Sequence, residues 1–373
     1  MRAMKSEQGV RKDRNYTIDL LRIIAMYMVC MIHINLFTHA HSIAAIIPGK
    51  EYFFYVGTLT ESIGFIGVNL YAIITGYVCL NSKWRFSRYL ELWGQVAFYT
   101  IVLLFTGWML YRFGVLGVVI DGDFIARSIR LLFMGSSYWY FTAYSALFLL
   151  MPFLNKLLLS LGQREYVLML CVLLLLIPSA DTQRGIYLFG TGYNVTWLAV
   201  LYAFGAYVKR FSPSVSPKVT VPIALVCILY PLICYQLHDP VIPFYCSLYV
   251  AVYSIAFFLF FYRLRIECSW LRKLIAWLAP LSFGVYLLHV HPWSWNVLAY
   301  YVPIWNKQMD YPWWIALVLG GILYIICSLL DWGRYHLFLL LRVRRAADFI
   351  GSMVEKAVLL QLNRFLPENK GRD

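Results

Sequence analysis

Residues 19–33 read DLLRIIAMYMVCMIH, a nearly continuous apolar stretch that carries an aspartate, an arginine and a histidine. The chain of 373 residues is 61% hydrophobic and 13% charged, whereas roughly a quarter of the residues in an ordinary soluble domain are charged. Apolar runs of about 20 residues recur along the chain, and a helix of that length crosses about 30 Å of hydrocarbon. The sequence therefore predicts an all-α polytopic membrane protein.

Hydropathy predicts a bundle of about ten transmembrane helices. The predicted spans are residues 16–37, 60–80, 90–111, 133–154, 166–180, 193–208, 219–236, 243–262, 274–293 and 313–332. We divide the chain into a basic N-terminal segment (1–15), a transmembrane domain (16–333) and a basic tail (334–373). The tail is amphipathic, and we expect it to lie on the inner leaflet of the membrane.

The net charge of +14 follows the predicted topology. An even number of spans places both termini on one side, and 25 of the 32 Lys and Arg residues fall on that side. Six lie on the other side, and Arg22 lies inside a span. Because cytoplasmic loops collect Lys and Arg, both termini are predicted to be cytoplasmic. The basic charge thus indicates contact with membrane lipids, and we expect no nucleic-acid partner.

The eight cysteines show no paired spacing of the kind that binds a metal. Most of them fall within predicted spans, where cysteine packs as a small apolar side chain. The sequence predicts no metal site.

Helical spacing places three ionisable residues on one face of the first span. Each residue advances a helix by about 100°, so Arg22 and His33, eleven residues apart, are offset by about 20°. Asp19 lies three residues before Arg22 on the same face. A charge inside a span costs about 2.5–3.5 kcal/mol and usually faces the bundle interior or a water-filled cavity. Either Asp19 and Arg22 merely neutralise each other near the membrane surface, or the three residues belong to a catalytic site.

A second histidine is expected at the same depth. His289 stands as far along the ninth span, in LSFGVYLLHVHPW (281–293), as His33 stands along the first. One membrane histidine often has only a structural hydrogen bond, whereas two imidazoles at one level indicate a site. A neutral imidazole tolerates burial and accepts a proton near neutral pH, as a general base must.

Other polar and aromatic residues are predicted in the outer half of the membrane. Trp139, Tyr140 and Tyr144 lie in the outer part of the fourth span, where an interfacial aromatic belt is one explanation and stacking on a sugar ring is the other. Asn69 in the second span requires a hydrogen-bond partner, and Gly76 allows another helix to approach closely. Asn69 and Tyr144 are candidates for stabilising an oxyanion.

A basic cluster follows the second span on the predicted cytoplasmic side. It consists of Lys83, Arg85 and Arg88. The positive-inside rule alone explains such a cluster. A phosphate-binding site is the alternative, because guanidinium groups form paired hydrogen bonds with phosphate.

Five blocks, in order, resemble the signatures of the membrane acyltransferase-3 family. They are DLLRIIAMYMVCMIH, with an Arg followed by a His eleven residues later, then GVNLYAIITGYVCL, RFSRYLELW, YWYFTAYSALFLLMPFLN and SFGVYLLHVHPW. Asn69 stands where many members have an acidic residue, and Thr75 stands where they have Ser. No esterase-like domain follows the tenth span, so the chain looks like the stand-alone form.

Members of that family are bacterial inner-membrane enzymes. The resemblance implies an O-acetyltransferase that moves acetyl from cytoplasmic acetyl-CoA to a hydroxyl of a cell-surface polysaccharide or lipid-linked glycan at the outer face. It also implies that Arg22 and His33 are the essential first-helix pair, that Arg85 and Arg88 lie near the CoA entrance, and that His289 and Tyr286 belong to the acceptor side.

The residues and the resemblance together predict an acyl-CoA-dependent enzyme without a metal. His33 would act as a general base on the sugar hydroxyl or as a transient acyl carrier. A transporter or flippase of a lipid-linked sugar is the alternative, although no repeated halves are visible in the sequence. A proton-coupled channel or receptor is a further alternative. An amino-acid or phospholipid acceptor also fits the enzyme interpretation.

Overall fold

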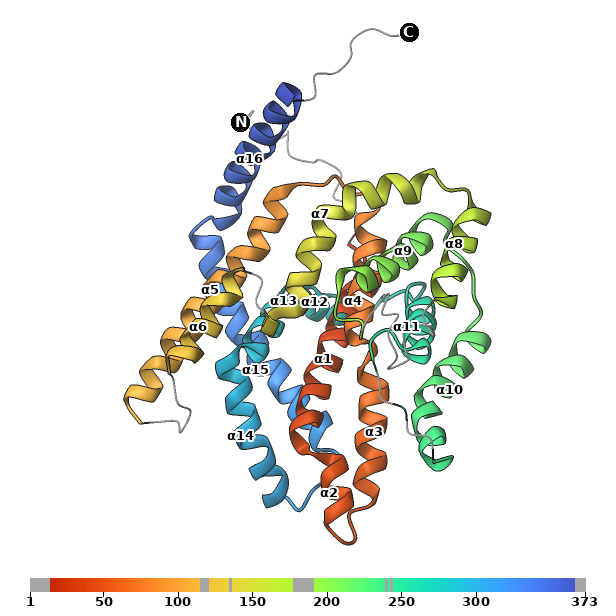
Figure 1. Cartoon of the computed structure of the whole chain (residues 1–373), viewed down its shortest axis with the longest axis vertical. Coiled ribbons are helices and arrows are strands. Elements are labelled where there is room, and N and C mark those ends of the chain that lie inside the picture. The colour runs from red at the N-terminus through yellow and green to blue at the C-terminus, as the bar shows by residue number, and fades with distance from the viewer. Residues whose placement is uncertain are drawn as a thin grey trace.

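The computed structural model describes residues 14–114, 121–133, 136–176, 191–238, 241 and 244–365. Its described elements are all helical, and Figure 1 shows α1 (Tyr16–Thr38) and α4 (Ile66–Cys79) near the middle of the bundle. Within the described residues, seven helices or continuous helix pairs are long and apolar enough to cross a membrane. The prediction of an all-α polytopic membrane protein is confirmed.

Each of the ten predicted spans overlaps a helix. The seven long ones are α1 continued by α2 (Ala40–Ile46), α3 (Tyr52–Gly64) continued by α4, α5 (Phe86–Arg112), α7 (Trp139–Ser160), α10 (Pro217–Gln236), α12 (Ser269–Leu278) continued by α13 (Ser282–Val290), and α15 (Ile315–Leu340). The other three overlap shorter helices of 13, 17 and 14 residues: α8 (Gln163–Leu175), α9 (Val195–Phe211) and α11 (Leu248–Phe261). Residues 177–180 of the fifth predicted span lie outside the described residues.

The helix α1 is the centre of the packing. It begins where the Asn15 side chain accepts a hydrogen bond from the backbone N–H of Ile18 at 3.1 Å. It ends at His39, whose backbone is left-handed with φ of 53°. Along its length α1 contacts α3, α4, α12, α13, α15 and the helix α14 (Pro292–Gln308). Polar groups on α1 therefore face other helices.

The helices α4 and α9 pack backbone against backbone. A Cβ atom on Gly76 would lie 1.9 Å from the carbonyl oxygen of Tyr202, and a Cβ on Gly205 would lie 1.8 Å from that of Ile73. Only glycine leaves room for this approach. The predicted close contact at Gly76 is confirmed.

Loops predicted to share one side of the membrane meet in space. At the predicted outer side, Lys50 pairs with Asp310 at 3.0 Å. At the predicted inner side, the Thr17 hydroxyl donates to the carbonyl of Leu264 at 2.7 Å. These contacts agree with the alternation of spans, while the orientation in the membrane stays a prediction.

Two helices near the C-terminus differ from expectation. The sequence predicted a loop between the last two spans, but the helix α14 lies there. Pro292 starts this helix, as proline often does in the first turn. Its mixed polar and aromatic sequence gave no hydropathy signal, so it was not predicted. The helix α15 runs on to Leu340, past the predicted end at 332. It is followed by α16 (Val343–Phe365), whose Glu355 accepts from the backbone N–H of Phe86 in α5 at 2.6 Å. The inner-leaflet position of the tail stays a prediction.

Candidate active site

The two predicted histidines meet in the bundle. His33 lies on α1 and His289 lies on α13, and Nδ1 of His33 is 3.0 Å from Nε2 of His289. Their ring centroids are 5.2 Å apart. His289 is buried, whereas His33 is partly exposed. The structure thus brings together two imidazoles from opposite ends of the chain.

A backbone carbonyl determines the protonation pattern of the neutral pair. Nδ1 of His289 lies 2.6 Å from the carbonyl oxygen of Val285, which can only accept a hydrogen bond. Nδ1 of His289 therefore carries the proton, and its Nε2 is an acceptor. It follows that Nδ1 of His33 donates to His289 and that Nε2 of His33 holds a free lone pair. This is the arrangement that a general base requires.

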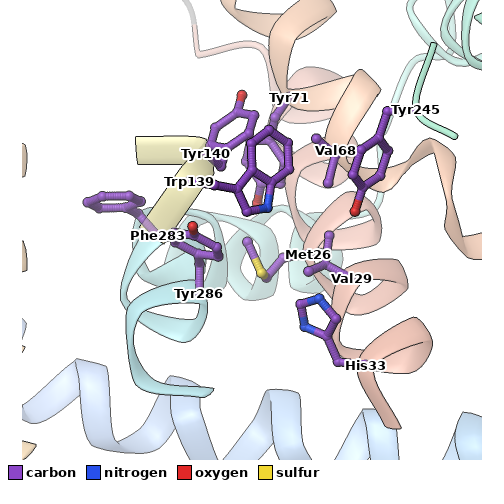
Figure 2. Close-up of a pocket in the computed structure, with 10 residues that line it drawn as sticks. All are labelled: Met26, Val29, His33, Val68, Tyr71, Trp139, Tyr140, Tyr245, Phe283 and Tyr286. Carbon is purple, nitrogen blue, oxygen red and sulfur yellow. The ribbon is translucent and has the colours of Figure 1, made fainter. Parts of the chain in front are cut away.

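Two cavities meet at His33. An inner chamber of about 50 Å³ lies on one side and an outer cavity of about 460 Å³ on the other, and His33, Trp139, Tyr245 and Tyr286 line both. Figure 2 shows these four side chains around the inner chamber together with its remaining lining residues, Met26, Val29, Val68, Tyr71, Tyr140 and Phe283. His33 stands at the junction of a narrow chamber and a wide cavity.

The outer cavity contains residues that the sequence did not single out as a site. Glu61 of α3 lines it and lies 3.4 Å from the side-chain amide of Asn35. Arg127 also lines it, and Trp295 of α14 packs edge-on against the His33 ring at 5.0 Å. Glu61 could have been predicted from the sequence, because it is a carboxylate at the end of an apolar span. Trp295 could not, because the helix α14 that carries it was not expected.

Aromatic rings form the wall between the two cavities. Trp139 stacks on Tyr245 with centroids 5.4 Å apart and also contacts Tyr193. Tyr140 lines only the inner chamber of the two and packs edge-on against Tyr286 at 6.4 Å. The buried Tyr286 hydroxyl donates to no described residue. Its oxygen faces the backbone N–H groups of Tyr140 and Phe141 at the start of α7. Tyr286 therefore offers an unused donor to both cavities.

Two predicted residues lie away from these cavities. The Asn69 amide donates to the carbonyl of Tyr245 at 2.9 Å and to the hydroxyl of Ser254 at 3.1 Å, and its oxygen accepts from the indole of Trp197 at 3.0 Å. These bonds hold α4 to its neighbours, and Asn69 lines neither cavity. Tyr144 also lines neither, and it lies within the electrostatic influence of arginines from the predicted inner side.

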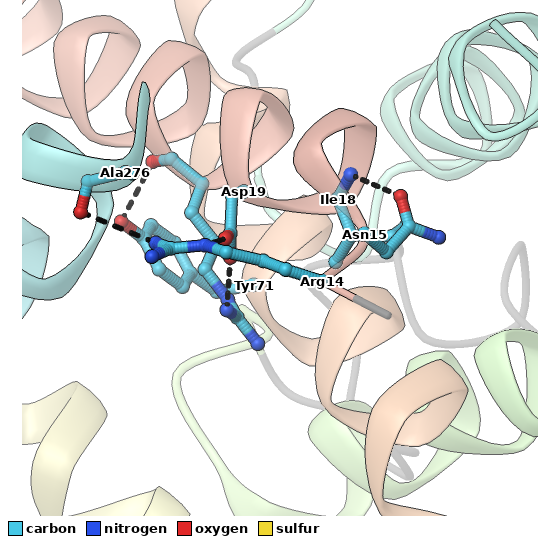
Figure 3. Close-up of polar contacts among 7 residues, drawn as sticks. Arg14, Asn15, Ile18, Asp19, Tyr71 and Ala276 are labelled. Carbon is cyan, nitrogen blue, oxygen red and sulfur yellow. Dashed lines mark hydrogen bonds and ion pairs between the residues drawn. The ribbon is translucent and has the colours of Figure 1, made fainter. Parts of the chain in front are cut away.

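The ion pair at the inner end of α1 involves a third residue. Asp19 accepts from Arg14 at 2.6 Å through one oxygen (Figure 3). Its other oxygen accepts from Arg22 at 2.7 Å. Arg14 also donates to the carbonyl of Ala276. Asp19 is buried, and both of its oxygens are engaged. Asp19 is therefore placed to hold Arg22 in position. Arg22 lies eleven residues, about 16 Å along the helix, from His33.

Tyr71 connects this inner end to the histidines. Its hydroxyl donates to the backbone carbonyl of Arg22 at 2.9 Å, and its side chain lines the inner chamber with His33. Arg88 of the basic cluster lies at the same end, near enough to Cys79 for both it and Arg22 to influence that thiol. Tyr71 thus links Arg22 at the basic end to the chamber that His33 lines.

The three predicted basic residues surround the start of α5. Arg85 is its N-cap residue, and Arg88 in its first turn lies 3.4 Å from the Ser82 hydroxyl. Lys83 and Arg88 are exposed, and Arg85 is half-buried. The first N–H of α5 is already bound by Glu355 of α16, so it is the exposed cations that suit an anionic ligand.

Comparison with known proteins gives a family. A family model described as an acyltransferase domain matches residues 15–332, which include both histidines, the ion pair and the basic cluster. The comparisons with curated proteins and with solved structures each returned no match.

Proposed function

The chain belongs to the acyltransferase-3 family, and we propose that it transfers an acetyl group from acetyl-CoA to a hydroxyl of a cell-surface polysaccharide or lipid-linked glycan. We place it in the bacterial inner membrane with both termini in the cytoplasm. The donor then enters at the basic end of the bundle, and the acceptor occupies the outer cavity. The membrane separates two substrates that meet only at His33.

The donor site consists of the basic cluster and the inner end of α1. Arg85, Arg88 and Lys83 bind the phosphates of CoA, because guanidinium and ammonium groups match several phosphates. Arg22, held by Asp19, borders the path of the pantetheine arm toward Tyr71. The exposure of Lys83 and Arg88 supports this assignment.

The inner chamber receives the thioester. With a volume of about 50 Å³ and a lining of Met26, Val29 and aromatic rings, it suits a short acyl group such as acetyl. A larger acyl chain would meet those side chains. The water-poor lining also protects the thioester from hydrolysis.

The chemical step takes place at Nε2 of His33. This nitrogen removes the proton from the acceptor hydroxyl as the hydroxyl oxygen bonds to the thioester carbonyl carbon. The Tyr286 hydroxyl, which donates to no described residue, donates to the developing oxyanion. The carbon–sulfur bond then breaks, and the CoA thiolate takes the proton back from His33. His289 holds the His33 ring and accepts from its Nδ1 throughout.

The outer cavity accommodates the acceptor. Glu61 and Arg127 offer hydrogen-bond partners for sugar hydroxyls, and Trp139 and Trp295 provide aromatic surface for a sugar ring. A volume of about 460 Å³ is of the size of ordinary small-ligand sites.

The observation that carries this proposal is the position of His33 between the two cavities with its Nε2 lone pair free. Release of CoA from acetyl-CoA by the purified full-length protein, with a bacterial surface-glycan extract as acceptor, tests it. Release should require both the extract and His33. A transporter or flippase of a lipid-linked sugar would consume no acetyl-CoA, so a folded wild type that neither binds nor cleaves acetyl-CoA would support that alternative.

The same assay distinguishes the two roles of His33. A general base transfers acetyl directly, whereas an acyl carrier leaves acetyl on the imidazole when the acceptor is withheld. Radiolabelled CoA is added to the enzyme with unlabelled acetyl-CoA and no acceptor, because only an acyl carrier exchanges the label into acetyl-CoA. We expect no exchange.

A further inference from the structure

A buried ion pair on α15 faces the helix that carries His289. Arg334 donates to both carboxylate oxygens of Asp331, at 2.9 Å and 2.6 Å. Tyr99 of α5 donates to the first of these oxygens at 2.6 Å. The side chains of Asp331 and Arg334 are 0% and 5% exposed. Three donated hydrogen bonds therefore hold this carboxylate inside the apolar bundle.

Stability alone does not account for such a pair. Buried ion pairs can often be replaced by apolar residues without loss of stability, because desolvation offsets the attraction. Ionisable residues within membrane spans usually have a functional reason. Neither Asp331 nor Arg334 lines the inner chamber or the outer cavity, so a direct part in the chemistry is not indicated.

The point at which the Asp331 carboxylate meets α13 suggests its role. A Cβ atom on Gly284 would lie 1.8 Å from Oδ1 of Asp331 and 2.0 Å from its Cγ. The carboxylate thus fills the notch that the absent side chain leaves on α13. Gly284 stands five residues before His289 and two before Tyr286, on the same short helix. A shift of α13 at the notch would move both residues.

We propose that Asp331 is a positioning residue: held by Arg334 and Tyr99, its carboxylate fits the Gly284 notch and sets α13 so that His289 accepts the hydrogen bond of His33. The inference rests on the proposed function, because the reaction at His33 is what requires this register. A carboxylate with three hydrogen bonds has one orientation, whereas an aliphatic side chain at this site would leave α13 free to slide.

Paired glycine variants provide the first test. Gly284→Ala adds a methyl group that collides with Asp331, whereas Gly333→Ala adds one where no atom lies within 4 Å. We expect Gly284→Ala to lower kcat for CoA release by about 10- to 100-fold, as a misplacement of about 1 Å does. The KM for acetyl-CoA should not change, and Gly333→Ala should match the wild type. Equal rates in the two variants would overturn the proposal.

A double-mutant cycle separates positioning from general damage. If Gly284→Ala acts by displacing His289 and Tyr286, it should have little further effect in a background of His289→Ala and Tyr286→Phe, since the groups that it displaces are already gone. A merely structural defect would multiply the two losses, and that result would count against the proposal. Tyr99→Phe, which removes one hydrogen bond without adding volume, should show the same non-additivity and serves if Gly284→Ala fails to fold.

A cross-linking measurement keeps the test independent of activity. In membranes, cysteines introduced by His33→Cys and His289→Cys are bridged with a bis-methanethiosulfonate reagent, and the linked peptides are identified by mass spectrometry. Adding Gly284→Ala should lower the yield several-fold, and adding Gly333→Ala should not. If the wild type releases no CoA but the cross-linking difference is found, the proposed function fails while the positioning by Asp331 stands.

Discussion

Nδ1 of His33 and Nε2 of His289 lie 3.0 Å apart, although 256 residues separate them in the chain. The Val285 carbonyl gives this pair a direction, since it accepts the Nδ1–H of His289 and leaves Nε2 of His33 as the basic end. A base at this position faces both the narrow inner chamber and the wide outer cavity. Acyl transfer across the membrane needs one group in contact with both substrates.

Replacement of His33 should abolish transfer without removing the protein. We expect His33→Ala to lower glycan-dependent CoA release by about 10²–10⁴-fold, the range of general-base catalysis. His336→Ala, at an exposed position on α15, is the matched control and should keep the wild-type rate. Immunoblots of membranes would show equal amounts of both variants. Normal glycan acetylation in His33→Ala would contradict the mechanism.

Because His289 accepts the hydrogen bond of His33, two replacements of His289 should differ in activity. His289→Gln keeps a carbonyl oxygen that can accept from Nδ1 of His33, whereas His289→Ala leaves that donor unpaired. We expect the Gln variant to retain about tenfold more activity than the Ala variant, as one hydrogen bond worth about 1.4 kcal/mol allows. Steady-state CoA release with saturating acetyl-CoA measures this. Equal activities would mean that His289 has a different role.

Charges at the two ends of the bundle should affect different substrates. Arg88→Ala should raise the KM for acetyl-CoA about 10-fold with little change in kcat, because it removes binding that is equal in the ground and transition states. The loss should shrink at high salt, where the contact is screened. Arg127→Ala, on the outer cavity, should leave that KM unchanged and raise the KM for the glycan. If Arg88→Ala instead raised the KM for the glycan and Arg127→Ala raised the KM for acetyl-CoA, the predicted donor and acceptor sides would be reversed.

Asn69 should matter for stability more than for catalysis. Asn69→Leu keeps the branched shape of the side chain but removes its hydrogen bonds to the Tyr245 carbonyl, the Ser254 hydroxyl and the Trp197 indole. A buried polar group that loses its hydrogen bond costs about 1–3 kcal/mol. We therefore expect a lower Tm in detergent and a nearly normal kcat per folded molecule. A variant with normal Tm and lost kcat would instead support an oxyanion role for Asn69.

The close approach of α4 and α9 gives a prediction about folding. In Gly205→Ala the new methyl group would lie 1.8 Å from the carbonyl oxygen of Ile73, so the helices must separate, at a cost of about 1–3 kcal/mol. Gly94→Ala, where no atom lies within 4 Å, should be neutral or slightly stabilising. Thermal unfolding followed by size-exclusion chromatography compares them. Identical Tm values would show that the two helices can move apart freely.

The local features of this protein followed from the sequence. Helix length and hydropathy predicted the membrane spans, because a helix satisfies its own backbone and its apolar side chains need hydrocarbon around them. The 3.6-residue period placed Arg22 and His33 on one face of α1, and the Gly76 contact was expected from residue size. Two features were not predicted: the break at Phe65 between α3 and α4, and the helix α14. Neither has a clear signal in the hydropathy of the sequence.

Only the tertiary structure determined which side chains meet. The pairing of His33 with His289, the binding of Asn69 by three partners, the entry of Glu61 and Trp295 into the outer cavity, and the fit of Asp331 against Gly284 all join distant segments. Such contacts depend on the rotation and depth of each helix relative to its neighbours. Those quantities are set by the packing of whole helix faces against one another, which no single stretch of sequence contains.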